Sequence, residues 1–269
     1  MGGYAGWRER ARSLVRESRG PRRERVAYRV VTRAAPPNPR TTRTSGYRDT
    51  DLPDVPPGFE AGAPRAGRRL VAAIGIDRYR EWTQLGNAVR DAQGVLAALE
   101  QLGFTAIERP LINEEATAEA IGGLPERLRD ATSWDDSVVV FFAGHGHTRV
   151  QHFPGGPHHA QGYLIPVDGG GESRGPGRWQ ALDPWLAELA ALPARHVAVI
   201  VDSCHSGIAL DRAAAFRARG VRDPASTTPF EARLSRRVLT SALDDQRALD
   251  GGPVPGHSVF TGFLIEALV

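Results

Sequence analysis

Lysine is absent from this 269-residue sequence, so all 34 of its basic residues are arginines. Cysteine occurs once, as Cys204, which excludes an intramolecular disulfide framework. No apolar run comes near the roughly 20 residues that a membrane-spanning helix needs, and the N-terminus has no apolar signal stretch. With 41% hydrophobic residues, the composition is typical of a globular protein, and we expect it in the cytoplasm with no membrane partner.

The formal net charge of +3 is the sum of two unequal parts. Residues 1–69 hold 16 Arg and 7 acidic residues, whereas residues 70–269 hold 18 Arg and 24 acidic residues. Basic arms often bind nucleic acid or anionic membranes, but a solvated, disordered flank has the same composition. Because the segment has no aromatic-interleaved or helix-turn-helix pattern, we do not expect nucleic acid as a partner.

The chain divides into a basic arm and a folded domain. Residues 1–68 are rich in Arg, Pro, Gly and Thr, a composition that buries little apolar surface, so we expect a largely disordered arm or pro-segment with one short strand at most, over residues 25–33. From residue 69 to 269, apolar strands alternate with amphipathic helices, which predicts an α/β fold with a mainly parallel sheet covered by helices on both faces. The expected strands are 69–77, 104–110, 137–144, 196–204 and 238–242, and the expected helices are 85–102, 114–130, 182–192 and 258–269.

Three long stretches interrupt this alternation and are expected to be loops. Residues 148–161 are rich in Gly and His, residues 169–178 are rich in Gly, and residues 208–237 are rich in Arg and Ala. Loops of this length inside a compact domain are usually functional or disordered.

Two of the expected strands run into residues that can perform nucleophilic chemistry. His145-Gly146-His147 follows one strand, and Asp202-Ser203-Cys204 ends another. In open α/β sheets, ligands bind at the carboxyl ends of the strands. If these two strands are neighbours, His145 and Cys204 face one crevice as an imidazole base and a thiol nucleophile, and the backbone amides of Gly146 and Cys204 can form an oxyanion hole.

These motifs resemble those of the caspase-like cysteine peptidases (peptidase family C14), most closely the metacaspases and their bacterial relatives. The resemblance rests on H-G-H at 145–147 and D-S-C-H-S-G at 202–207, and it covers residues 69–269. It implies a three-layer caspase fold. Three further matches are Leu85-Gly86-Asn87 followed by Asp91, Tyr163-Leu164-Ile165-Pro166-Val167-Asp168, and Asp244-Asp245-Gln246.

By this resemblance, Cys204 is the catalytic nucleophile and His145 is its base. No third catalytic acid is needed, because a thiol with a pKa near about 8.5 ionises far more easily than a hydroxyl. The alternatives are a buried structural cysteine and a hydrogen-bonded core histidine, and the pairing of the two motifs favours catalysis over both. His147 and His205 are expected to pack beside the site rather than to react.

The resemblance also predicts which side chain the substrate presents. Asp91 and Asp202 match the acids of the metacaspase specificity pocket, which accepts Arg or Lys. Two carboxylates facing one crevice favour a guanidinium, which can pair with them bidentately. Solvated surface aspartates are the alternative.

Two regulatory hypotheses follow for a peptidase of this specificity. Caspase-like zymogens often carry a processing segment where residues 208–237 lie, so we expect self-cleavage there, after an Arg between 212 and 222, against the alternative of an uncut linker. The basic arm of residues 1–68 has the charge to occupy an acidic cleft of its own domain, which would inhibit the enzyme.

Metal binding is weakly supported. Calcium activation is common in metacaspases, but of the expected acidic cluster only Asp168 and Asp183 remain, too few for a site of 6 to 8 oxygen ligands. We therefore expect no cofactor. Zinc is a rival hypothesis, because Cys204 and five histidines have the side chains that bind it, although the spacing of the histidines is irregular: His145, His147, His152, His158 and His159.

The leading hypothesis is thus a cysteine endopeptidase that cleaves protein or peptide substrates after Arg. The alternative is a catalytically silent caspase-like scaffold that binds partners, which the presence of both His145 and Cys204 disfavours. Because the sequence stops inside an apolar helix, at residues 258–269, we expect a longer protein with a further sensor or targeting domain, or a regulatory partner.

Overall fold

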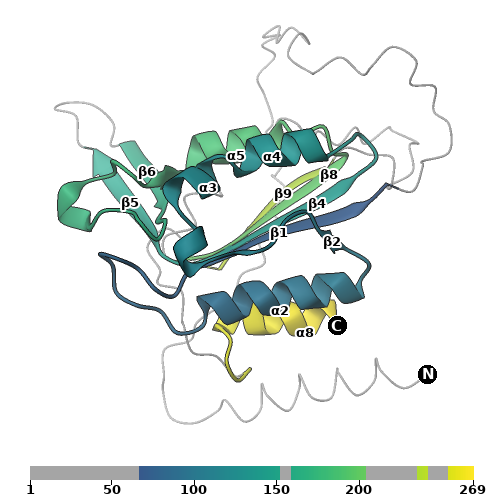
Figure 1. The fold of residues 1–269 in the computed structure, drawn as a ribbon, viewed down its shortest axis with the longest axis horizontal. Coiled ribbons are helices and arrows are strands. Elements are labelled where there is room, and N and C mark those ends of the chain that lie inside the picture. Colours follow the sequence, from purple (N-terminus) through teal and green to yellow (C-terminus); the bar gives the residue numbers. More distant parts are fainter. Residues whose placement is uncertain (1–66, 152–158, 204–234, 242–253) are drawn as a thin grey trace, which may run out of the picture. The chain divides into compact units, whose positions relative to one another are not determined.

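The computed structural model describes residues 67–151, 159–203, 235–241 and 254–269 (Figure 1). The short strand expected at 25–33 and most of the expected processing segment, 208–234, lie outside these residues, as does Cys204. Within the described residues, no helix is both long enough and apolar enough to cross a bilayer.

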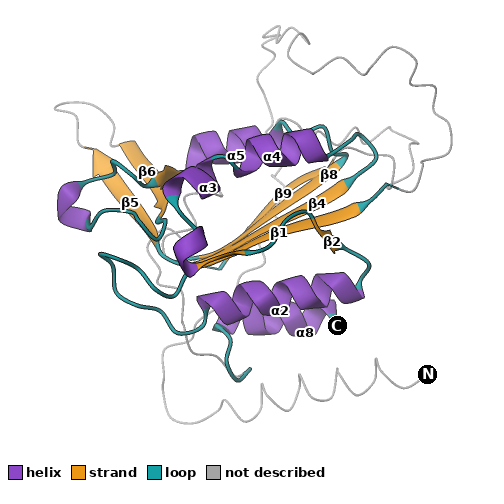
Figure 2. Ribbon diagram, in the orientation of Figure 1, coloured by secondary structure: helices purple, strands orange, loops and turns teal. Residues whose placement is uncertain are grey.

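The described residues contain a six-stranded, wholly parallel sheet (Figure 2). Its central strands are nearly continuous runs of buried apolar residues, as expected for a sheet that is covered on both faces. The strand order is β2-β1-β4-β8-β9, and β3 also pairs with β1. The bounds are β1 Arg69–Gly75, β2 Thr105–Ala106, β3 Leu111–Ile112, β4 Ser137–Ala143, β8 His196–Asp202 and β9 Ser235–Thr240.

Helices cover both faces of this sheet. One face carries α3 (Ala118–Gly122), α4 (Leu124–Ala131) and α5 (Leu182–Ala190), and the other carries α2 (Ala88–Gln101) and α8 (Val259–Leu268) (Figure 1). Successive strand residues point to opposite faces, so β4 divides its side chains between the two layers. Val138, Val140 and Phe142 join the core under α5, while Val139 and Phe141 join the core under α2. The predicted three-layer α/β fold is confirmed.

Two expected elements are broken into shorter ones. The strand expected at 104–110 is replaced by β2 and β3, each of two residues. The helix expected at 114–130 consists of a 3₁₀ turn, η1 (Asn113–Glu115), followed by α3 and α4. The interruption falls at Gly122 and Gly123, just before Pro125, which lies in the first turn of α4 where its missing N–H costs nothing.

The loop prediction for 148–161 was wrong at both ends. β5 (Gly146–Gln151) and β6 (His159–Leu164) form an antiparallel pair, and β7 (Gln180–Ala181) extends it to a second, three-stranded sheet. These strands are rich in Gly, His and Gln, and their pairing is not visible in a local apolar pattern. The loop predicted at 169–178 is irregular apart from one 3₁₀ turn, η2 (Glu172–Arg174).

Candidate active site

The two motif-bearing strands are neighbours, which was the condition for a shared site. β4 and β8 pair in parallel along their whole length, with Ala143 opposite Asp202, and the amide of Gly144 donates to the carbonyl of Asp202 (3.2 Å). His145 follows Ala143 by two residues, and Cys204 follows Asp202 by two. The strand ends that precede His145 and Cys204 in the sequence therefore lie side by side.

His145 is held by its backbone and by its ring. Its amide donates to the hydroxyl oxygen of Tyr79 (2.7 Å), and its ring lies 4.7 Å from the Tyr79 ring, centroid to centroid. Its Nε2 lies 2.8 Å from the carbonyl oxygen of Thr83. Because a carbonyl only accepts, Nε2 carries the hydrogen in this contact, and the neutral ring then has its proton-accepting lone pair on Nδ1.

Tyr79 was not predicted from the sequence. It follows β1 at the same edge of the sheet and is buried, and burial raises the pKa of its hydroxyl well above the usual value, so the hydroxyl keeps its proton. Gly144 allows the contact, because a Cβ at that position would lie 2.5 Å from the Tyr79 hydroxyl. The only sequence signal was an aromatic residue soon after a buried strand.

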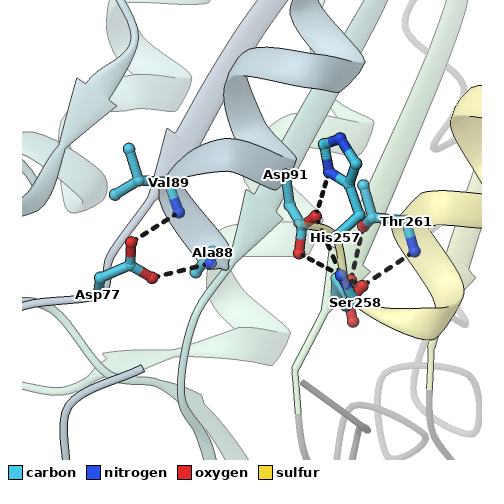
Figure 3. Close-up of polar contacts among 8 residues, drawn as sticks. Asp77, Ala88, Val89, Asp91, His257, Ser258 and Thr261 are labelled. Carbon is cyan, nitrogen blue, oxygen red and sulfur yellow. Dashed lines mark hydrogen bonds and ion pairs between the residues drawn. The ribbon is translucent and has the colours of Figure 1, made fainter. Parts of the chain in front are cut away.

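The two predicted pocket acids are both bonded to Ser258, the residue directly before α8; Figure 3 shows the contacts of Asp91 with His257 and Ser258. Asp91, from the first turn of α2, is 2% exposed, and Asp202, from the end of β8, is 5% exposed. Ser258 joins them, because its amide donates to Asp91 (3.2 Å to Oδ1) while its hydroxyl donates to Asp202 (2.5 Å). Thr261 adds a second hydroxyl to Asp202 (2.6 Å), and Nδ1 of His257 lies 2.8 Å from Asp91.

The burial of this acid pair, Asp91 and Asp202, has an electrostatic consequence. Burial raises the pKa of Asp91 to about 6, and the charge of Asp202 adds to the rise, whereas the hydrogen bonds from His257 and Ser258 oppose it. The alternative of solvated surface aspartates is therefore wrong. Neither His257 nor Ser258 was predicted, although Ser258 stands where a helix cap is expected, directly before an apolar helix.

The first two backbone amides of α2, the helix that carries Asp91, donate to a carboxylate. Asp77, just after β1, accepts from the amides of Ala88 (2.8 Å) and Val89 (3.4 Å) (Figure 3). This cap satisfies N–H groups that have no partner inside the helix. It fixes the residue at which α2 begins, and therefore the position of Asp91 in the first turn of that helix.

Gly146, the expected oxyanion donor, is the first residue of β5 and pairs with Leu164. The carbonyl of His145 accepts from the amide of Ile165 (3.0 Å), so the backbone at and directly after the candidate base is held by β6 and the residue that follows it. The oxyanion role of Gly146 stays a prediction, as does that of the Cys204 amide.

Two of the residues that were considered for metals, Asp168 and His147, have other contacts. Asp168 accepts from the amide of Ala118 (2.8 Å) and forms an ion pair with Arg178 (2.5 Å). The ring of His147 contacts the indole rings of Trp82 and Trp179, and its Nε2 lies 3.7 Å from Glu172. Among the described residues, no three His, Cys, Asp or Glu side chains are grouped to hold a metal ion.

The comparisons with known proteins agree with this geometry. Residues 68–269 match the family model of the caspase domain, peptidase C14. Metacaspase-1A of Neurospora crassa is 24% identical over 202 residues, which cover 67% of this chain and 43% of the relative, so the match spans less than half of that protein. The crystal structure of protein GSU0716 from Geobacter sulfurreducens has the same fold, with a TM-score of 0.51, 20% identity, and coverage of 74% of this chain and 81% of that chain.

Proposed function

The chain belongs to the caspase-domain family of peptidases, and from that premise we propose that it is a cysteine endopeptidase that cleaves proteins after arginine. The observation that carries the proposal is the register of β4 and β8. Since Ala143 pairs with Asp202, His145 and Cys204 both follow the same rung of the sheet by two residues. A base and a thiol are the two groups that thiol peptidase chemistry requires, and this register supports a common site for them.

In the proposed reaction, the Cys204 thiolate attacks the scissile carbonyl and forms a tetrahedral oxyanion. The amides of Gly146 and Cys204 donate to this oxyanion as its charge develops. His145, which takes the thiol proton on Nδ1, gives it to the leaving amine as the carbon–nitrogen bond breaks. Water, deprotonated by His145, then hydrolyses the thioester and releases the acid product.

The acid pair supports the proposed preference for arginine. With a pKa of about 6, Asp91 is ionised at neutral pH, and a guanidinium can satisfy two carboxylates with its fork of N–H groups. To reach Asp91, the substrate guanidinium would replace the Nδ1 of His257, whose side chain is only 20% exposed. Asp91 and Asp202 are therefore proposed as the substrate-binding residues.

Two further parts of the proposal concern the protein in the cell. The single cysteine, which has no partner for an intramolecular disulfide, fits the reducing cytoplasm. The loop expected at 208–237 is shorter at its end, because β9 begins at Ser235; self-processing before that strand, after an Arg between 212 and 222, is the proposed route of activation.

Hydrolysis of paired peptides tests the proposal. The two peptides differ only in Arg or Asp before the scissile bond, and each is offered to wild type, Cys204→Ala and His145→Ala with and without calcium. We expect wild type to cleave the Arg peptide, and both variants to be inactive. Cleavage after Asp would refute the pocket, and a folded wild type that cleaves neither peptide would favour the silent scaffold that binds partners.

A further inference from the structure

The carbonyl that holds His145 belongs to a short segment, residues 79–84, between β1 and α2. The segment is closed on itself, because the side chain of Gln84 accepts from the amide of Tyr79 (3.2 Å) and donates to its carbonyl (2.8 Å). Its middle is held differently, by side chains that reach the irregular loop after β6. The position of the Thr83 carbonyl therefore depends on those contacts.

Trp82 makes the central contact to that loop. Its indole N–H donates to the carbonyl of Gly170 (2.9 Å), and the indole N–H of Trp179 donates to the same oxygen (2.7 Å). One residue earlier, Glu81 accepts from the amide of Gly171 (2.9 Å) and pairs with Arg174 (2.7 Å). A carbonyl oxygen has two lone pairs, so the two indoles together can occupy both acceptor positions of Gly170.

Trp82 also contacts the candidate base directly. Its ring lies 5.7 Å from the ring of His145, tilted by 40°, and 5.5 Å from the ring of Trp179, nearly edge-on. The ring of Trp179 contacts the ring of His147 (5.0 Å) instead. Among the ring contacts of the described residues, none joins Trp179 to His145. Of the two indoles that share Gly170, Trp82 is thus the one that contacts His145 and is covalently bonded to Thr83.

We propose that Trp82 is a positioning residue for the catalytic base, one that fixes the Thr83 carbonyl and the ring of His145 so that Nε2 keeps its hydrogen and Nδ1 serves the thiol. This inference rests on the proposed dyad of His145 and Cys204. Positioning matters because the reaction can slow about a hundredfold when a catalytic base is displaced by 1 Å.

The test compares Trp82→Phe with a matched control, Trp179→Phe. Each variant loses one indole N–H to the same carbonyl oxygen, but only the first alters the neighbour of Thr83 and His145. Because the chain has a single thiol, the pH dependence of its alkylation by iodoacetamide reports the ionisation of Cys204 in each variant, and kcat and KM for an Arg peptide are measured alongside.

We expect Trp82→Phe to move the alkylation midpoint upward, toward the about 8.5 of a free thiol, and to lower kcat about tenfold with little change in KM. Trp179→Phe should keep a midpoint near that of wild type at a similar melting temperature. Trp82→Tyr, which restores a donor, should recover part of the loss, and it is compared with Trp179→Tyr if the Phe variants do not fold.

Equal midpoints in the Trp82 and Trp179 variants, or no change in either, would overturn the inference. His145→Ala separates this failure from a failure of the proposed function. If His145→Ala leaves the alkylation midpoint unchanged, the dyad itself is wrong, whereas a shift in His145→Ala without one in Trp82→Phe rejects only the role of Trp82.

Discussion

At the scale of single residues, the main feature of the candidate site is a pair of buried carboxylates. Asp91 and Asp202 come from different elements and are almost completely buried. Their compensation comes from His257, Ser258 and Thr261. A ligand that binds there must offer donors at least as good as these, which a guanidinium does with a full positive charge.

The titration of Asp91 gives the first prediction. As the pH falls through about 6, Asp91 takes up a proton and loses its charge, so KM for an Arg peptide should rise below that pH and stay level above it. Asp91→Asn should raise KM roughly tenfold at pH 7.5 and remove this pH dependence. Steady-state kinetics between pH 5 and about 8 check both expectations. An ordinary Asp, with a pKa of about 4, would leave KM level over this whole range.

Asp130→Asn is the control for this experiment, because it also removes one negative charge but lies exposed in α4. Its KM curve should follow that of wild type. A pH-independent KM in wild type, or equal effects of the two substitutions, would contradict the pocket. Among the described residues, the charged side chains that act on Asp91 are Asp202 and His257, and His145 is not one of them. His145 should therefore affect kcat rather than the dependence of KM on pH.

Residue identity points to some members of the candidate site and not to others. His145, Asp91 and Asp202 stand in recognisable motifs, and their proposed roles stay predictions. Thr83 contributes its backbone carbonyl, which any residue type could supply. His257 and Tyr79 act through contacts 166 and 66 residues away along the chain, so only the folded structure brings them to the site.

At the scale of elements, the central parallel strands β1, β4 and β8 were predictable because their burial on both faces demands continuous apolar runs. The second sheet was not, because β5 and β6 are stabilised by pairing with each other rather than by an apolar pattern of their own. The first turn of α8 joins fold and site, since Ser258 caps the helix through the Thr261 amide (3.0 Å) and also donates to Asp202.

This double role predicts two effects of Ser258→Ala. The loss of the cap and of the bond to a buried carboxylate should lower the free energy of unfolding by about 1 to 3 kcal/mol, measured by urea titration. The same change should raise KM for an Arg peptide, because Asp202 loses one of the two hydroxyl donors that orient it.

Thr117→Ala separates the two effects. Thr117 caps α3 by accepting from the Ala120 amide (3.2 Å), and it takes no part in the acid pair. Its loss should lower the unfolding free energy by about 1 kcal/mol and leave KM unchanged. If Ser258→Ala destabilises the protein but also leaves KM unchanged, Ser258 is a helix cap and nothing more.

At the scale of the whole molecule, the uneven charge distribution makes self-inhibition testable. The basic arm precedes a domain with a surplus of acids, and arginine is the only side chain with which the arm could imitate a basic substrate. The structure indicates where a deletion of the arm should end, because Arg68 forms an ion pair with the buried Asp136 (2.6 Å). A deletion should therefore stop at residue 66.

Removal of residues 1–66 should raise kcat/KM for a small Arg peptide severalfold. The same residues added back as a separate peptide should inhibit the truncated enzyme, and the inhibition should weaken at high salt because it depends on charge. Equal rates with and without the arm would exclude self-inhibition and leave the peptidase assignment untouched.

The most direct test of the central claim is covalent capture of the nucleophile. Two peptide chloromethyl ketones, with Arg or Asp next to the reactive carbon, are incubated with wild type and His145→Ala, and the labelled residue is located by mass spectrometry. We expect one Arg reagent on Cys204 of wild type, much slower labelling of His145→Ala, and little reaction with the Asp reagent. A folded wild type that is not labelled at Cys204, or that takes both reagents equally, would contradict it.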